Sequence, residues 1–223
     1  VDRGEAFGCG RPDCAPGCDC DRFLEIWNLV FMQFFQDEDG SRRPLAQRNI
    51  DTGMGLERLA AVMQEVATVY ETDLFRPILT RIEELAGGAY GADARRDYAM
   101  RVLADHSRAM TFLVSDGVQP GPEGRGYVLR RIIRRAVRYG RQLGLSGPFL
   151  GTLVDVVGDL MGQWYPELRS NRAAIQAVIA KEESRFSGTL ERGLSLLEQW
   201  IAEAQARGER VLSGERLFEL HDT

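Results

Sequence analysis

The spacing of apolar residues divides the chain into a first part of mixed character and a second part that is helical throughout. From Phe23 to Phe35 the sequence is almost continuously apolar and rich in aromatic and β-branched residues, which predicts a strand buried on both faces. Asp39–Gly40 follows as a hairpin-turn signal. From about residue 91 onward, apolar residues recur three and four positions apart, as in helices with one buried side. We therefore predict an α+β fold with a mixed part over residues 1–90 and an all-helical part over residues 91–223.

One face of the predicted strand carries a polar residue among apolar ones. Because side chains alternate along a strand, Asn28 and Val30 share that face. A buried asparagine needs hydrogen-bond partners, which are either backbone groups or a ligand. The sequence leaves both interpretations open, a satisfied core amide and a binding residue.

A glycine-rich turn, Asp51-Thr52-Gly53-Met54-Gly55, leads directly into a predicted helix. Glycines at such a turn let a ligand approach the backbone closely. Asp51 is suited to receive an ammonium group, and Arg58, in the first helical turn, is suited to bind phosphates. The alternative is an ordinary turn and helix start with solvated charges.

A second predicted helix follows the loop at residues 119–124 and carries seven arginines between Arg125 and Arg141. Its apolar residues fall on one side, and they are Leu129, Ile132, Ile133, Ala136 and Val137. Like charges four residues apart destabilise a helix, and no acidic residue lies within this segment. A phosphate backbone would offset the repulsion, whereas salt bridges from a solvated basic face are the alternative. The predicted phosphate-binding residues are Arg125, Arg130, Arg131, Arg134, Arg135 and Arg138.

Composition indicates in what kind of protein this basic helix occurs. The 223 residues are 44% hydrophobic and carry a net charge of −5, so the positive charge is local to one binding face. Without a long apolar run or a signal peptide, we expect a cytoplasmic protein with no membrane segment. The chain begins with Val1 rather than methionine, and its last residues continue an apolar pattern, so we expect both ends to be internal to a longer protein.

All four cysteines fall within one short, turn-rich segment, at Cys9, Cys14, Cys18 and Cys20. Four thiolates so close together can close a tetrahedral Zn²⁺ site, and the absence of a secretory signal favours metal over two disulfides. Reduced cysteines without a ligand are a further alternative. Four protein ligands leave no open position, so the predicted zinc is structural rather than catalytic.

Three collinear stretches resemble alanyl-tRNA synthetases, a family of class II aminoacyl-tRNA synthetases. They are Trp27–Phe34, Asp51–Arg58, and Arg101–His106 followed by Gly124–Arg131, and the resemblance covers nearly the whole chain. It implies the C-terminal part of a class II antiparallel-sheet core, lacking the family's first and second motifs, followed by an all-helical tRNA-recognition region. The implied reaction is activation of alanine by ATP with Mg²⁺, followed by transfer of the alanyl group to the 3′ end of tRNA(Ala).

The resemblance also implies roles for individual residues. Asp51 would bind the alanine ammonium group, Gly53 would let alanine lie against the backbone, and Asn28 and Val30 would border its pocket. Arg58 matches the family's catalytic third-motif arginine, and with Gly55 it would bind ATP.

Recognition of the tRNA acceptor stem is implied for two further positions. Asp222 and the loop before Arg125 match the positions that read the wobble G·U pair, although Pro122 stands where the family usually has an asparagine. We expect the 223-residue chain alone not to form alanyl-adenylate. The competing interpretations are a non-catalytic RNA-binding module and a small zinc-stabilised interaction protein.

Overall fold

The computed structural model describes residues 1–222, with side chains described through Leu220. The chain forms two compact units, Val1–Leu74 and Phe75–Thr223. The boundary precedes the change of character that the sequence places near residue 90. The reason is that helix α2 (Arg76–Ala86) packs against helices α3 and α5 of the second unit.

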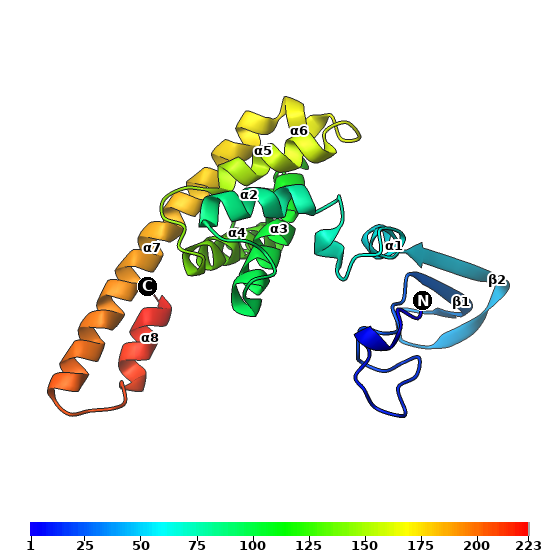
Figure 1. Cartoon of the computed structure of the whole chain (residues 1–223), viewed down its shortest axis with the longest axis horizontal. Coiled ribbons are helices and arrows are strands. Elements are labelled where there is room, and N and C mark those ends of the chain that lie inside the picture. The colour runs from blue at the N-terminus through cyan, green and yellow to red at the C-terminus, as the bar shows by residue number, and fades with distance from the viewer. Residues whose placement is uncertain (223) are drawn as a thin grey trace. The chain divides into compact units, whose positions relative to one another are not determined.

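The first unit is built around one antiparallel hairpin (Figure 1). Its elements are η1 (Glu5–Phe7), β1 (Trp27–Gln36), β2 (Arg42–Met54), α1 (Leu56–Met63) and η2 (Val69–Glu71). The predicted turn at Asp39–Gly40 is confirmed: it joins the two strands, and Gly40 has φ 84°, a conformation that glycine adopts without strain.

Strand β1 differs from its prediction in burial. It begins at Trp27 rather than Phe23, and every residue from there to Gln36 is exposed. The prediction of a strand buried on both faces is therefore wrong for this unit. The physical reason is that the described sheet consists of β1 and β2 alone, so no second layer of strands covers either face.

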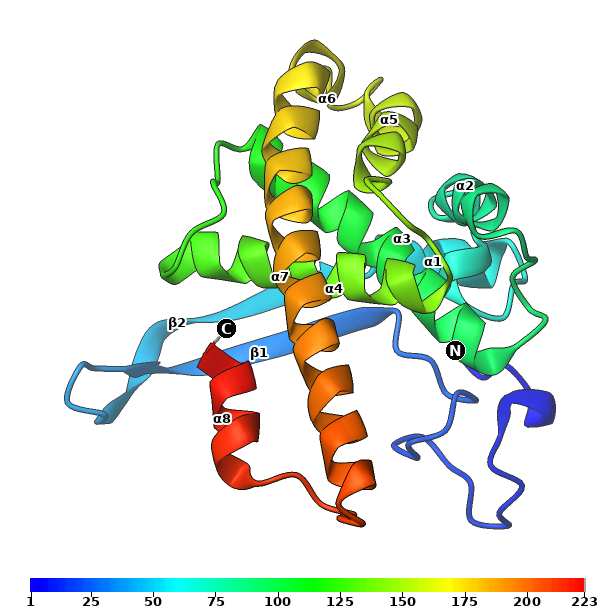
Figure 2. The ribbon, with the colours of Figure 1, turned by 90° about the vertical axis from the view of Figure 1, so that its left-hand side faces the viewer.

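The second unit contains the remaining described helices, and no strand lies among its described residues. They are α2, α3 (Ala94–Ser115), α4 (Gly124–Gln142), α5 (Leu150–Met161), α6 (Glu167–Ser170), α7 (Arg172–Ala206) and α8 (Gly214–Asp222). Helix α7 is the longest of them, and α8 folds back beside its C-terminal half (Figure 2), where Arg216 pairs with Glu203 at 2.8 Å. None of these helices combines the length and apolar character that crossing a bilayer requires, within the described part of the chain.

Helix α4 lies against α3 and α7 through the side that the apolar spacing predicts. Leu129, Ile133, Ala136 and Val137 are buried, whereas Ile132 at the edge is half-buried. Further along this side, Gly140 allows a close approach to α5, because a Cβ there would lie 2.1 Å from the Phe149 ring. The apolar side thus fixes the opposite, arginine-rich side toward solvent.

Candidate functional site

The register of the hairpin brings together the four residues expected to bind alanine. Asn28 pairs with Gly53 and Val30 pairs with Asp51. Because side chains alternate along each strand and directly opposed residues share a face, these two pairs are neighbours on one face of the sheet. Residues from two separate sequence stretches therefore form one exposed patch.

Gly53 leaves open space above this face. A Cβ placed on Gly53 would meet no heavy atom within 4 Å, so packing does not require glycine at this position. Opposite it, the Asn28 side chain donates a hydrogen bond from Nδ2 to Glu25 Oε1 at 3.3 Å and is exposed. The interpretation of Asn28 as a core amide is thus excluded in this unit. Both features leave room for a small ligand against the backbone.

Arg58 is held at the same end of the hairpin. Gly55 follows β2, donates its N–H to Ile26 O at 3.0 Å and precedes the first residue of α1, as the glycine-turn pattern predicts. From the first turn of α1, Arg58 donates from Nη1 to the Glu25 carbonyl at 2.9 Å. A guanidinium group has five N–H donors, so this bond orients Arg58 and leaves donors for phosphates.

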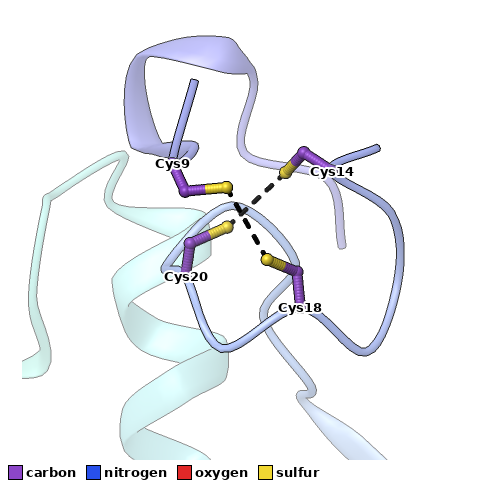
Figure 3. A group of neighbouring side chains, drawn as sticks. All are labelled: Cys9, Cys14, Cys18 and Cys20. Atoms are coloured by element: carbon purple, nitrogen blue, oxygen red, sulfur yellow. Dashed lines mark hydrogen bonds between the residues drawn. The ribbon is translucent and has the colours of Figure 1, made fainter. Parts of the chain in front are cut away.

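The four cysteine side chains converge, as Figure 3 shows, and their Sγ atoms all lie within 4.8 Å of one another. The separations are 3.7 Å for Cys9–Cys18 and 3.6 Å for Cys14–Cys20. Tetrahedral coordination with Zn–S bonds of ~2.3 Å requires sulfur atoms about 3.8 Å apart. All four are free thiols rather than disulfides, so the donor set fits Zn²⁺.

Arg11 lies next to this cluster and changes its electrostatics. It donates from Nε to Cys9 Sγ at 3.3 Å and from Nη2 to Cys18 Sγ at 3.0 Å. The side-chain hydrogen bond from Arg11 to Cys9, together with one from the Arg11 backbone, lowers the pKa of Cys9 to about 6. Burial instead raises the pKa of Cys14 to about 11. The guanidinium group therefore offsets part of the negative charge that four thiolates would bring to a metal.

Two arginines of α4 have carboxylate partners on α7. Arg134 Nε lies 2.7 Å from Oε1 of the buried Glu182, and Arg141 pairs with Glu191. Salt bridges therefore offset part of the repulsion along the helix, as one of the two sequence interpretations holds. Between described side chains, no ion pair engages the other arginines, which are Arg125, Arg130, Arg131, Arg135 and Arg138.

Aromatic rings support most of these five arginines. The guanidinium groups of Arg130 and Arg131 lie 5.6 and 5.9 Å from the Tyr127 ring centroid. Arg135 and Arg138 lie 5.5 and 5.6 Å from that of Tyr139. A ring orients a guanidinium group without removing its charge, so the positive face of α4 persists.

A hollow of about 460 Å³ opens on this basic face, between α3, α4 and α7. Its lining residues are His106, Val128, Arg131, Ile132, Arg134, Arg135, Arg138 and Phe186. His106 is half-buried, and its Nδ1 lies 3.0 Å from Asp105 Oδ2; this hydrogen bond lowers the pKa of Asp105. The spacing of apolar residues around His106 predicts a position in the core and does not predict its place beside the arginines. One sequence feature indicates a functional role for His106: Asp105 and His106 lie in Arg101–His106, one of the three stretches with a family resemblance.

The loop before α4 folds back onto the first turn of that helix. Gly121 donates its N–H to Gly126 O at 3.0 Å. A Cβ on Gly126 would lie 2.6 Å from Gln119 O, so only glycine permits this contact. Pro122 is exposed at the tip of the loop. The side chain of Asp222, the other residue expected to read RNA bases, lies outside the described side chains.

Comparisons with known proteins agree with these features. A family model described as tRNA synthetases class II (A) matches residues 1–223. The chain is 56% identical to an alanine–tRNA ligase of Desulfosudis oleivorans, 55% to one of Pelotomaculum thermopropionicum and 52% to one of Desulfitobacterium hafniense. Each alignment covers 100% of this chain and 25–26% of the relative, so the chain spans about a quarter of the length of these relatives. The chain belongs to the class II (A) tRNA synthetase family, the family of the alanine–tRNA ligases.

Proposed function

We propose that this chain is the part of an alanine–tRNA ligase that binds alanine and the ATP phosphates through its hairpin and tRNA(Ala) through its helices. The observation that carries the proposal is the strand register, which places Asn28 opposite Gly53 and Val30 opposite Asp51 beside Arg58. Family membership supports the same reaction class.

The hairpin face has the chemistry that a small amino acid requires. The Asp51 carboxylate receives the ammonium group, and the open space at Gly53 lets the substrate lie against the backbone. Asn28 and Val30 border the side-chain pocket. One methylene in such a pocket changes binding by only ~1–3 kcal/mol, so this face by itself discriminates weakly between alanine and serine or glycine.

Arg58 acts on the phosphates of ATP. An alanine carboxylate oxygen attacks the α-phosphorus, pyrophosphate leaves, and the terminal ribose hydroxyl of the tRNA then displaces AMP from the alanyl carbonyl. Mg²⁺ would enter with ATP as part of the substrate and would supply positive charge to the phosphates. Arg58, anchored through Nη1 to the Glu25 carbonyl, supplies fixed donors to the phosphate oxygens.

The four-cysteine loop has a structural role in this proposal. Cys9, Cys14, Cys18 and Cys20 hold Zn²⁺, which fixes a segment that contains little regular secondary structure. The bound metal has no open position for substrate, so its contribution is stability and positioning rather than catalysis.

The basic face of α4 binds phosphates of the tRNA acceptor stem, and its arginines divide into two kinds. Arg125, Arg130, Arg131, Arg135 and Arg138 form no close ion pair among the described side chains and bind phosphate. Arg134 faces the same hollow, but its charge is matched by Glu182. Asp222 reads the wobble G·U pair from the end of α8.

Binding of an acceptor-stem hairpin RNA to this chain tests the proposal. We expect salt-sensitive binding that is tighter with the G·U pair than with G·C in its place. Arg131→Gln should weaken binding to both RNAs and reduce the slope of log K against log salt by about 1. The matched variant Arg134→Gln should leave that slope unchanged and instead lower the melting temperature, because it leaves Glu182 buried without its partner. Equal slopes for Arg131→Gln and the unmodified chain would refute the assignment of phosphate contacts.

A further inference from the structure

The hollow beside α4 has features that duplex backbone binding does not need. We propose that it binds one unpaired nucleotide of the RNA, with the phosphate on the arginines and the base against the apolar wall. This inference rests on the proposed tRNA-binding role of α4 and specifies which part of an RNA the hollow accepts.

The size of the hollow is the first argument. A volume of about 460 Å³ falls within the ~300–1,000 Å³ typical of small-molecule pockets and exceeds what one phosphate group occupies. Binding to the phosphate backbone of a duplex requires only arginines on an exposed helix surface. A concave site of this volume therefore indicates that a larger part of the ligand enters it.

The mixed lining is the second argument. One wall is cationic and contains Arg131, Arg135 and Arg138, none of which forms an ion pair within 4.0 Å with a described carboxylate, although the charge of Arg135 acts on the nearby Asp105. The other wall contains Ile132 and Val128 from α4 and Phe186 from α7, and the guanidinium group of Arg134 lies 5.1 Å from the Phe186 ring centroid. Val128 is 53% exposed, so its apolar surface is open to a ligand. A phosphate attached to a flat apolar base matches both walls.

The arginines on the cationic wall are already oriented. Arg135 donates from Nη2 to the Tyr98 hydroxyl at 3.2 Å, and Arg135 and Arg138 both lie over the Tyr139 ring. Binding therefore costs less side-chain entropy than it would with freely moving arginines. Guanidinium planes and aromatic rings are also the surfaces on which proteins stack unpaired bases.

His106 adds a polar contact between the two walls. Its Nδ1 is engaged by Asp105 Oδ2, so Nε2 is the ring nitrogen left for a ligand. In the neutral ring with its proton on Nδ1 and directed at Asp105, Nε2 is an acceptor that suits an exocyclic amino group or a ribose hydroxyl. In duplex RNA the adenine and cytosine amino groups lie in a deep, narrow major groove that side chains do not reach, so an unpaired nucleotide presents them more openly.

Titration of the chain with three ligands of increasing size tests the inference, with NMR detection at the Ile132 methyl groups and the Phe186 ring. The ligands are inorganic phosphate, ribose 5-phosphate and adenosine 5′-monophosphate. We expect adenosine 5′-monophosphate to bind roughly ten-fold tighter than ribose 5-phosphate, because stacking of the base adds to the phosphate contact. Only the nucleotide should shift the Ile132 and Phe186 signals strongly.

Substitutions inside and outside the hollow test which residues determine the affinity for each ligand. Phe186→Leu should remove most of the ten-fold advantage of the nucleotide, whereas Tyr127→Leu, on α4 but outside the hollow, should retain it. Arg138→Gln should weaken all three ligands, and Arg125→Gln, also outside the hollow, should weaken none. Ile132→Ala provides a second test of the apolar wall if the Phe186 variant melts at a lower temperature.

The outcomes separate this inference from the proposed function. Equal affinities for adenosine 5′-monophosphate and ribose 5-phosphate, without a shift at Ile132, would overturn the nucleotide site even if hairpin RNA binds with the expected salt dependence. Nucleotide binding without any salt-sensitive binding of the hairpin RNA would instead overturn RNA as the occupant.

Discussion

The two units of the chain differ in what holds them together. Of the buried apolar side chains, Ala61 is the one within Val1–Leu74, and the others belong to the second unit. In the first unit, Trp27, Phe31 and Ile50 are each more than half exposed. The helical unit is thus stabilised by its own apolar core, whereas the hairpin unit relies on strand hydrogen bonds and its cysteine loop.

The same difference separates the two candidate sites. The arginines of α4 project from a helix whose opposite side is fixed in a core, so their positions depend on packing within the unit. The hairpin face proposed to bind alanine depends on strand register instead, which pairs Val30 with Asp51 but supplies no covering layer in the described sheet. One site is positioned by packing and the other by main-chain pairing, so they should respond differently to perturbation.

Removal of metal should produce the largest contrast. We expect the chain to contain Zn²⁺ and a chelator to open the loop from Cys9 to Cys20, because the site's binding free energy, ~10–16 kcal/mol in zinc peptides, is also the folding energy of such a loop. Metal analysis and limited proteolysis of the loop measure this change. The helical melting transition followed by circular dichroism should remain unchanged.

The opposite result would break the comparison. A chain that contains no zinc and whose loop still resists protease would show that the loop folds without metal. A chelator-induced loss of the helical transition would show that the units do not fold independently.

A matched pair of isoleucines gives the next largest effect. Ile133 is 0% exposed in the core of the helical unit, whereas Ile50 is 61% exposed on β2. Ile133→Ala should cost about 2–5 kcal/mol of unfolding free energy through lost burial and a residual cavity. Ile50→Ala should cost less than about 1 kcal/mol, mainly through strand propensity.

Amide hydrogen exchange measures the loss of unfolding free energy separately in the structural unit that carries each substitution. Similar losses at the two positions would indicate that Ile50 is covered in solution, and the contrast between a packed and an uncovered unit would then fail.

The sequence predicts local features well and contacts between distant residues poorly. The apolar side of α4, the turn at Gly40 and the helix start after Gly55 follow from spacing and backbone preference, which are local properties. The cysteine cluster is local as well, because all four residues lie within twelve positions. The pairing of Arg134 with Glu182 joins residues 48 positions apart, and no pattern within either helix indicates it.

Burial is the property that the sequence misjudges. The apolar run at β1 predicts a core strand because such runs are usually covered on both faces. Exposure is decided by which other elements pack against the strand, and the strand's own residues do not encode that. The position of His106 beside a hollow is unpredictable for the same reason. Its place on the apolar side of a helix does not show that α4 and α7 leave a hollow next to it.

The smallest predicted effect concerns a buried carboxylate on α7. Glu183 is 1% exposed, and its Oε1 accepts hydrogen bonds from the N–H groups of Phe149 at 2.9 Å and Leu150 at 3.3 Å at the start of α5. Its Oε2 is buried without a hydrogen-bond partner among the described atoms. Burial raises the pKa of Glu183 above its ordinary value of 4.5, although the two backbone donors oppose the change.

The sign of the pH dependence follows from this raised pKa. A carboxyl group that binds its proton more tightly in the folded state contributes stability below pH 4.5, and that contribution is lost as the pH rises through the raised value. Glu183→Gln keeps an oxygen acceptor for the two N–H groups and removes the ionisation. We therefore expect the variant to be more stable than the parent at neutral pH, by about 1 kcal/mol or less, and to lose this advantage in acid.

Urea unfolding at acidic and neutral pH measures the difference, and Glu198→Gln, at an exposed position of the same helix, is the control that removes one charge without changing a buried contact. A parent chain and a Glu183→Gln variant with parallel stability profiles would show that Glu183 stays ionised at neutral pH at little cost. In that event a buried charge in the helical unit would cost as little unfolding free energy as a surface charge on the hairpin unit. Burial would then not make the two units differ in their response to pH.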